Sequence, residues 1–249
     1  MAKQSGIIKI EGTIDDITFL KKGGKYFIRK KGGVSKSRIK TDSAFQRTRE
    51  NGAEFGIVAN AGKLIRKGAS AMVRRAKDGS LNNRLMSILY KVKDFDSVSP
   101  RGQRKVSTGI TTSGGVATLK GFAFNSKAPL SSVLATPYSL ALTTGIITFQ
   151  NFVPMDMVEY PLGATHVGLR AGILSIDFLE ETTLLEISDQ DNLPIDMAEH
   201  EVTLTPELIG GATGIKMYLL LIEFYQEING LQYPLKDGSF NSLTLLDLE

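Results

Sequence analysis

The sequence predicts an α+β protein, in which an N-terminal β-hairpin and a helical hairpin precede an antiparallel β-sandwich of about seven strands. Three observations indicate this class. Short glycine-bounded apolar segments open the chain, helical periodicity extends from about residue 42 to 96, and strand-like segments separated by turn residues fill the second half. We expect three parts: a basic hairpin element over 1–41, a helical hairpin with a linker over 42–110, and an acidic sandwich over 111–249.

The N-terminal segment predicts strands over 6–10, 14–20 and 25–31. Glycines in "KKGGK" can adopt a positive φ, so the last two strands should form a hairpin. In the third strand Tyr26 and Ile28 alternate with Phe27 and basic residues, so neither face is apolar throughout. Because a lone hairpin is marginally stable in water, we expect other structure to cover it.

The next segment predicts two helices. Asp42 or Ser43 is a suitable N-cap for the first, over 42–76. Its apolar face is expected to comprise Phe45, Phe55, Ala59, Leu64 and Ile65. Glycines at 52, 56 and 62 cost roughly 1 kcal/mol each against alanine, which indicates a close backbone approach or a helix break. The second helix, over 80–95, has an apolar stripe of Leu81, Leu85, Ile88, Leu89, Val92 and Phe95.

The remaining chain predicts a loop over 96–109 and then a β-rich region. Its expected strands cover 116–124, 146–152, 167–178, 184–188, 202–205, 215–226 and 243–248. The two longest of these strands, 167–178 and 215–226, should lie at the centre of the β-sandwich. The hairpin and the C-terminal strand could each pair with a neighbouring copy's sheet or pack on their own chain.

Charge is divided unevenly along the chain. Residues 1–110 carry 25 Lys/Arg and 9 Asp/Glu, a net charge of +16, whereas residues 111–249 carry 5 and 17, a net charge of −12. Such asymmetry concerns partners and association rather than fold. The segment 21–40 holds nine basic residues and no acidic one. The candidate interface residues are Lys21, Lys22, Lys25, Tyr26, Phe27, Arg29, Lys30, Lys31, Lys36, Arg38 and Lys40.

This asymmetry leads to two hypotheses about partners. In the first, the basic element binds the acidic sandwich of another copy and gives a filament, tube or virion-like shell. The expected acidic partner face comprises Asp189, Asp191, Asp196, Glu199 and Glu201. In the second, the cations contact nucleic-acid phosphates while Tyr26 and Phe27 stack on bases. We favour self-association because the negative second half would repel a polyanion.

The sequence gives little support for an enzyme. His166 and His200 are the only histidines, and no G-x-S-x-G motif accompanies them. The carboxylates of segment 189–201 resemble calcium ligands, but they lack the spacing of an EF-hand, so we expect a solvated loop. The chain has no cysteine, which excludes disulfides and thiolate-bound metals. We therefore expect no catalytic residue, cofactor or metal. A ligand-binding sandwich remains a third class.

Targeting signals are also weak. The first residues contain no apolar run of signal-peptide length, so we expect synthesis in the cytoplasm without a classical signal peptide. The most apolar stretch, 215–225, is too short to cross a bilayer and contains Glu223, so we expect no membrane insertion.

The opening "GIIKIEGTIDDITFLKKGGKYFIRKKGG", followed by "DSAFQRTRENGAEFG" and "AGKLIR", resembles a family of uncharacterised Bacteroidota proteins. Its features are a glycine-punctuated hairpin, an R-x-K-x-G step, and an F-x-R-T-R-E-N helix before a variable β-rich half. The resemblance covers about the first 110 residues, and "FQRTREN" is its most specific part. It implies no established activity and supplies no catalytic residues. By analogy, it is compatible with a shared assembly element.

Overall fold

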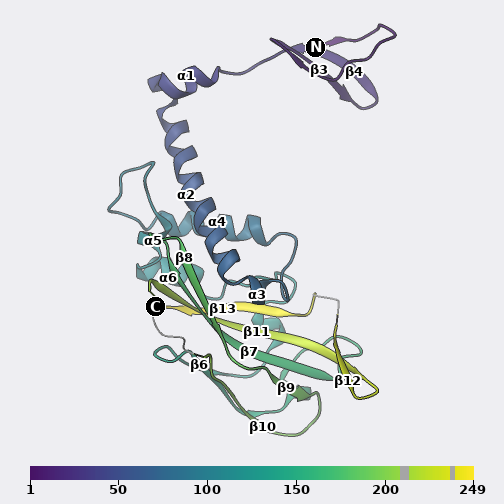
Figure 1. Ribbon diagram of the computed structural model, residues 1–249, viewed down its shortest axis with the longest axis vertical. Helices are drawn as coiled ribbons and strands as arrows, with labels where there is room; N and C mark the ends of the chain where they lie inside the picture. The colour runs from purple at the N-terminus through teal and green to yellow at the C-terminus, as the bar shows by residue number, and fades with distance from the viewer. Residues whose placement is uncertain (208–212, 236–238) are drawn as a thin grey trace. The chain divides into compact units, whose positions relative to one another are not determined.

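A computed structural model of the chain describes residues 1–207, 213–235 and 239–249 (Figure 1). The α+β class is confirmed. The chain divides into two compact units, which we call unit 1, Met1–Glu50, and unit 2, Asn51–Glu249. This division differs from the three expected parts, because most of the helices share a core with the second half of the chain.

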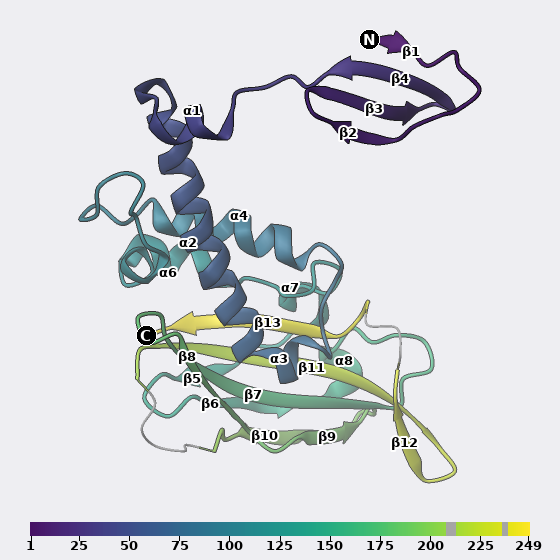
Figure 2. The same ribbon diagram turned by 45° about the horizontal axis from the view of Figure 1, so that its top comes forward.

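Unit 1 is built on a four-stranded antiparallel sheet in the order β1-β4-β3-β2 (Figure 2). Its strands are β1 (Ala2–Lys3), β2 (Gly12–Ile14), β3 (Ile17–Lys22) and β4 (Lys25–Lys30). The predicted β3–β4 hairpin is confirmed, and its turn places Gly23 and Gly24 at φ of 57° and 73°.

The predicted strand over 6–10 is wrong, because the chain forms a bent loop there. The Gln4 side chain holds this loop: its Oε1 accepts from the Ile10 amide (3.0 Å), and its Nε2 donates to the Ile10 carbonyl (3.1 Å). A side chain thus satisfies backbone groups that a strand would have paired.

Two short helices complete unit 1, α1 (Lys36–Thr41) and η1 (Ser43–Phe45). Asp42 caps η1, because its side chain accepts a hydrogen bond from the Ala44 amide (2.9 Å). Asp42, one of the two predicted caps, therefore begins η1, while α1, which was not predicted, lies before it with Ser35 as its cap.

The longest helix, α2 (Gln46–Gly68), begins in unit 1 and ends in unit 2. Its buried face comprises Glu54, Val58, Ala61, Gly62 and Ile65. The predicted face is therefore wrong at Phe55, which is 56% exposed. Ile65 is the one residue of the predicted face that belongs to the buried set.

The other helices of unit 2 are α3 (Ser70–Val73), α4 (Leu81–Lys93), α5 (Val106–Gly109), α6 (Ser113–Leu119), α7 (Leu130–Val133) and α8 (Pro154–Met157). The predicted stripe of α4 is confirmed at Leu81, Leu85, Leu89 and Val92, which are buried, whereas Phe95 beyond its end is exposed. The predicted strand over 116–124 is wrong, because α6 covers residues 116–119 and the rest contributes an isolated β-bridge from Ala123 to Thr244. Thr112 begins α6 by accepting a hydrogen bond from the Gly115 amide (3.0 Å).

Unit 2 contains two antiparallel sheets. Their strands are β5 (Ser139–Ala141), β6 (Ile146–Phe152), β7 (His166–Asp177), β8 (Thr182–Ile187), β9 (Asp191–Pro194), β10 (His200–Leu204), β11 (Ile215–Ile228), β12 (Leu231–Pro234) and β13 (Ser242–Leu248). The larger sheet centres on β7 and β11, as predicted; β8 and β9 follow the outer side of β7, and β12 and β13 that of β11. The smaller sheet has the order β10-β6-β5. Six of the seven predicted strands are confirmed.

Two cores hold unit 2 together, one on each face of the larger sheet (Figures 1 and 2). On one face Leu219 and Leu221 pack with helical residues such as Leu89. On the other, Leu220 and Phe224 pack with the smaller sheet. Burial on both faces explains the nearly continuous apolar sequence of β7 and β11, since neither face needs polar residues.

The C-terminal strand packs on its own chain. β13 pairs with β11, and backbone hydrogen bonds of 2.8 and 2.9 Å join Glu249 to Lys216. Of the two alternatives for this strand, the structure has the packing on its own chain.

Candidate assembly surfaces

The predicted basic residues lie on both faces of the unit 1 sheet and on α1. Cross-strand pairing places Lys21 beside Tyr26 and Ile17 beside Lys30 on one face. Lys22, Lys25, Phe27 and Arg29 alternate with these residues and lie on the opposite face. Lys31 follows β4, and Lys36, Arg38 and Lys40 lie on α1. The basic residues of the strands therefore form two groups, one on each face of the sheet, rather than a single group.

Most of these cations have no acidic partner. Arg38 pairs with Asp42 (2.8 Å), and that side-chain hydrogen bond lowers the pKa of Asp42. None of the other eight forms an ion pair within the described residues, and all eight are exposed. Lys21 lies 5.3 Å from the Tyr26 ring centroid, and Lys9, which the sequence analysis did not select, lies 6.0 Å from it.

The five predicted acidic residues divide between the two sheets of unit 2. Asp191 begins β9 in the larger sheet, and Asp189 lies just before it. Asp196, Glu199 and Glu201 instead surround the start of β10 in the smaller sheet. They are therefore not a single patch defined by one strand.

Asn151 organises the second group of acids. Its backbone amide donates to Glu201 Oε1 (3.2 Å), and its side-chain amide lies 2.9 Å from Glu199 Oε1 and 3.2 Å from Glu201 Oε1, which it can bind by donating when its nitrogen is assigned to that side. His200 Nε2 lies 3.9 Å from Asp196 Oδ1. Within the residues that the structure describes, no group of three His, Cys, Asp or Glu side chains could hold a metal ion.

The other histidine lies at the start of β7, the strand entrance that the sequence predicts. His166 Nδ1 lies 3.0 Å from Thr165 Oγ1, and Nε2 lies 3.6 Å from Glu227 Oε2. A threonine and a glutamate therefore flank this ring. The contacts fix its position at the sheet end without supplying the serine of a hydrolytic triad.

A buried charge cluster in unit 2 was not predicted. Glu54 of α2 accepts two hydrogen bonds from Arg104 (2.8 and 2.9 Å) and lies 2.8 Å from Lys93 Nζ at the end of α4. The Gly102 amide also donates to it (2.8 Å). The hydrogen bonds from Arg104 are the main reason that the pKa of Glu54 falls to about 2, although burial opposes them. The cluster fastens the loop before α5 to both helices.

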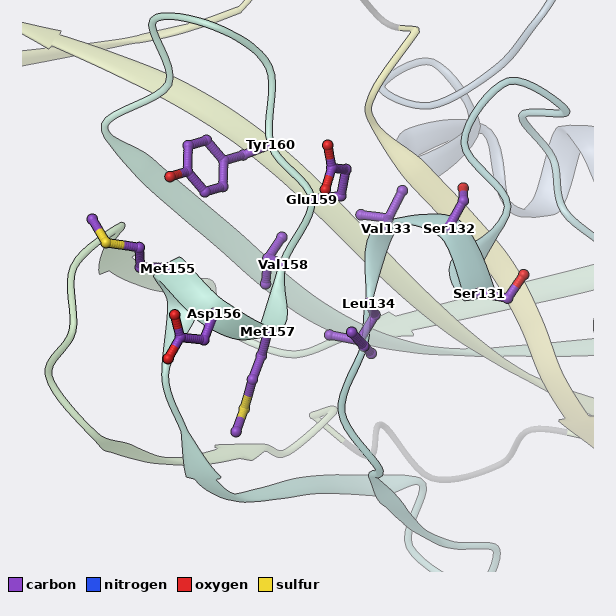
Figure 3. A pocket seen from close by; sticks show the side chains of 11 residues that line it. Ser131, Ser132, Val133, Leu134, Met155, Asp156, Met157, Val158, Glu159 and Tyr160 are labelled. Atoms are coloured by element: carbon purple, nitrogen blue, oxygen red, sulfur yellow. The ribbon is translucent and has the colours of Figure 1, made fainter.

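A polar hollow of about 370 Å³ lies between the segments that contain α7 and α8 (Figure 3). Ser131 and Ser132 come from one segment and Asp156 from the other. Backbone hydrogen bonds of 2.8 Å, from Ala135 to Met157 and from Glu159 to Val133, join them. The lining combines hydroxyls, carboxylates and apolar side chains but has no cation to orient an anionic group.

A second, more apolar cleft of about 400 Å³ opens where α2 and α5 meet the end of β7 and the start of β11. It is lined by Ile57, Leu64, Val106, Phe178, Leu179 and Ile215. Its acidic rim includes Asp177 and Glu181, and Lys105 also lines it. We call it the α2–β7 cleft. No local sequence pattern identifies this cleft, because its lining residues come from distant segments.

The fold and these surfaces define the protein as an α+β protein with a cationic N-terminal sheet and a two-core second unit. No protein-family model, curated protein or solved structure matches this chain. None of the helices among the described residues is long and apolar enough to cross a membrane.

Proposed function

We propose that this protein is a non-enzymatic structural protein that self-assembles head to tail, with unit 1 of one copy bound to unit 2 of the next. The main support is the composition and burial of unit 1. It carries 13 Lys/Arg and 5 Asp/Glu, a net charge of +8, and its sheet and short helices contain no fully buried residue. An element with no core of its own gains stability when a partner covers it.

Unit 2 has the complementary charge. It carries 17 Lys/Arg and 21 Asp/Glu, and the acids are concentrated in the two-sheet region. Opposite charges on two different surfaces of the same molecule favour head-to-tail encounters over symmetric ones. Such contacts give a ring if the rotation closes and a filament if it does not.

Light scattering and electron microscopy of the purified full chain test this proposal. We expect large species at an ionic strength of roughly 0.02 M that shrink at roughly 0.5 M, because salt screens exposed charge pairs. The double variant Lys30→Glu/Lys31→Glu should assemble poorly. The matched control Lys63→Glu/Lys67→Glu makes the same charge change on exposed positions of unit 2 and should retain assembly. A strictly monomeric wild-type protein at high concentration and low salt would refute the proposal.

Binding to nucleic acid is the alternative. The face with Lys22, Lys25 and Arg29 around Phe27 supports it, because exposed cations beside an aromatic ring can contact phosphate and base together. A filter-binding titration across salt distinguishes the two functions. A steep fall of affinity with salt favours nucleic acid. Nucleic-acid binding that survives Lys30→Glu/Lys31→Glu while oligomers dissolve favours self-assembly.

A further inference from the structure

The unit 1 sheet has one face richer in apolar side chains than the other. Cross-strand pairing aligns Ile14 with Ile17 and Phe19 with Ile28, and alternation adds Tyr26. We call these five residues the apolar face. Ile14 is 58% exposed and Ile17 45% exposed. The alternation of residues within β4 does not reveal this face, because most of its residues lie in β2 and β3.

The apolar face sets requirements for whatever covers it. The covering surface must be apolar, because two exposed isoleucines and three half-buried side chains would otherwise stay in contact with water. It should also have an acidic edge, because Lys21 and Lys30 lie on the same face as the apolar residues.

The α2–β7 cleft meets both requirements. Its walls are largely aliphatic and aromatic, and Leu179 at its edge is 85% exposed. The Asp177 carboxylate accepts hydrogen bonds from the amides of Leu179 and Glu180, which lower its pKa. Asp177 and Glu181 therefore give the cleft an anionic rim, and Glu180 lies between them in sequence.

Other hollows in the described part of unit 2 fit less well. One of about 510 Å³ is lined by Arg66, Arg74 and Lys77, which would repel a cationic sheet. The hollow between α7 and α8 is mainly polar. A third, of about 430 Å³, is apolar, but its lining includes Lys120 and no acidic residue, whereas Lys105 in the α2–β7 cleft is accompanied by Asp177 and Glu181.

We propose that the apolar face of unit 1 in one copy docks in the α2–β7 cleft of the next copy. Lys21 and Lys30 would then meet Asp177 and Glu181 around an apolar centre. This inference rests on the proposed head-to-tail assembly and names the two surfaces that form its contact. The surfaces differ, so one copy can use both at once and a chain of copies can grow.

Disulfide trapping tests the contact, because the chain has no cysteine and each introduced pair is unique. A protein with Ile17→Cys is mixed with a protein with Leu179→Cys under mild oxidation. We expect a covalent heterodimer. Two control mixtures each retain one of these cysteine variants and place the second cysteine at a different position. Leu162→Cys replaces a leucine that is 104% exposed and outside the cleft lining, and Thr18→Cys lies on the opposite sheet face. Both should crosslink far less.

A second measurement uses non-covalent assembly. Leu179→Lys should raise the protein concentration needed for assembly by about tenfold or more, the change expected when one leucine side chain is no longer buried. Leu162→Lys should leave that concentration unchanged. Circular dichroism of both variants checks that they fold, which their exposure favours.

The outcomes separate this inference from the proposed function. Wild-type assembly without preferential crosslinking of Ile17→Cys to Leu179→Cys overturns the inference and leaves head-to-tail assembly in place. A monomeric wild type overturns both. If the double variant Ile17→Cys/Leu179→Cys crosslinks mainly within one chain at every concentration, the face closes on its own cleft, and the proposed contact between copies is wrong.

Discussion

Glu54 shows how one side chain can connect separate segments. It is 2% exposed, and it contacts Lys93 of α4 and Arg104 of the following loop. Breaking a buried ion pair leaves an uncompensated charge in a low-dielectric surrounding. Glu54 should therefore contribute more to the free energy of unfolding than a carboxylate in a solvent-exposed ion pair does.

We expect Glu54→Gln to lower the free energy of unfolding by about 3 kcal/mol or more, because Lys93 and Arg104 lose their buried partner and keep only Asp94, whose side chain is 56% exposed. Urea denaturation followed by circular dichroism measures this. Lys120→Ala is the control, since Lys120 is 56% exposed in its pair with Asp247, and surface pairs contribute about 1 kcal/mol or less. Equal losses of unfolding free energy in Glu54→Gln and Lys120→Ala would contradict the larger contribution expected of Glu54.

The same carboxyl predicts an acid-dependent stability. The folded pKa of Glu54 is about 2, below its ordinary value of 4.5, mainly because of hydrogen bonds from Arg104. Burial raises the pKa of Asp96, but backbone amides, including those of Ser99 and Lys105, outweigh it and lower that pKa to about 2. The unfolded chain therefore binds more protons in acid, so stability should fall as pH drops from about 5 toward 2. The urea midpoint should depend less steeply on pH over this range in Glu54→Gln than in the wild type.

Close backbone packing distinguishes the short helices from α2. A Cβ added at Gly109 of α5 would lie 2.0 Å from the Val92 carbonyl oxygen of α4. A Cβ added at Gly115 of α6 would lie 2.0 Å from the Gly109 carbonyl oxygen. At Gly56 of α2 it would meet nothing within 4 Å. The predicted close approach is thus absent at Gly56 and occurs in helices that the sequence did not predict.

A glycine-to-alanine substitution should therefore have opposite effects on stability at Gly109 and at Gly56. Gly109→Ala should destabilise the protein by about 1–3 kcal/mol, because the added methyl group has no space. Gly56→Ala should stabilise it by up to about 1 kcal/mol through helix propensity. Thermal unfolding of the two variants measures both effects. A neutral Gly109→Ala would show that α4 and α5 do not approach this closely.

The two units differ in how they are stabilised. Unit 2 has two hydrophobic cores, whereas no residue described in unit 1 is fully buried. Local stability follows buried apolar contact, so the unit 1 sheet should open far more readily than β7 or β11.

Amide hydrogen exchange checks this difference. In dilute protein at high salt, amides of β3 and β4 should exchange quickly, while those of β7 and β11 should be strongly protected. Raising the protein concentration at low salt should slow exchange in β3 and β4, because assembly covers them. Strong protection of β3 and β4 in a confirmed monomer would instead mean that unit 1 is stable without a partner.

The sequence by itself determined the α+β class, the β3–β4 hairpin, the α4 stripe, and the positions of β6, β7, β8, β10, β11 and β13. These elements have a local signal, since glycine turns, helical periodicity and long apolar runs are properties of neighbouring residues. It also determined the charge asymmetry, which depends only on the positions of the charged residues along the chain.

Only the tertiary structure decided the rest. The α6 helix, the short strands β5, β9 and β12, the partners of Glu54, the apolar face and the α2–β7 cleft all depend on contacts between distant segments. Pairing β2, β3 and β4 collects on one face apolar side chains of which each strand alone supplies only one or two. The physical reason is that burial and cross-strand register are set by the partner segment, and a one-residue shift in register would move each side chain to the opposite face.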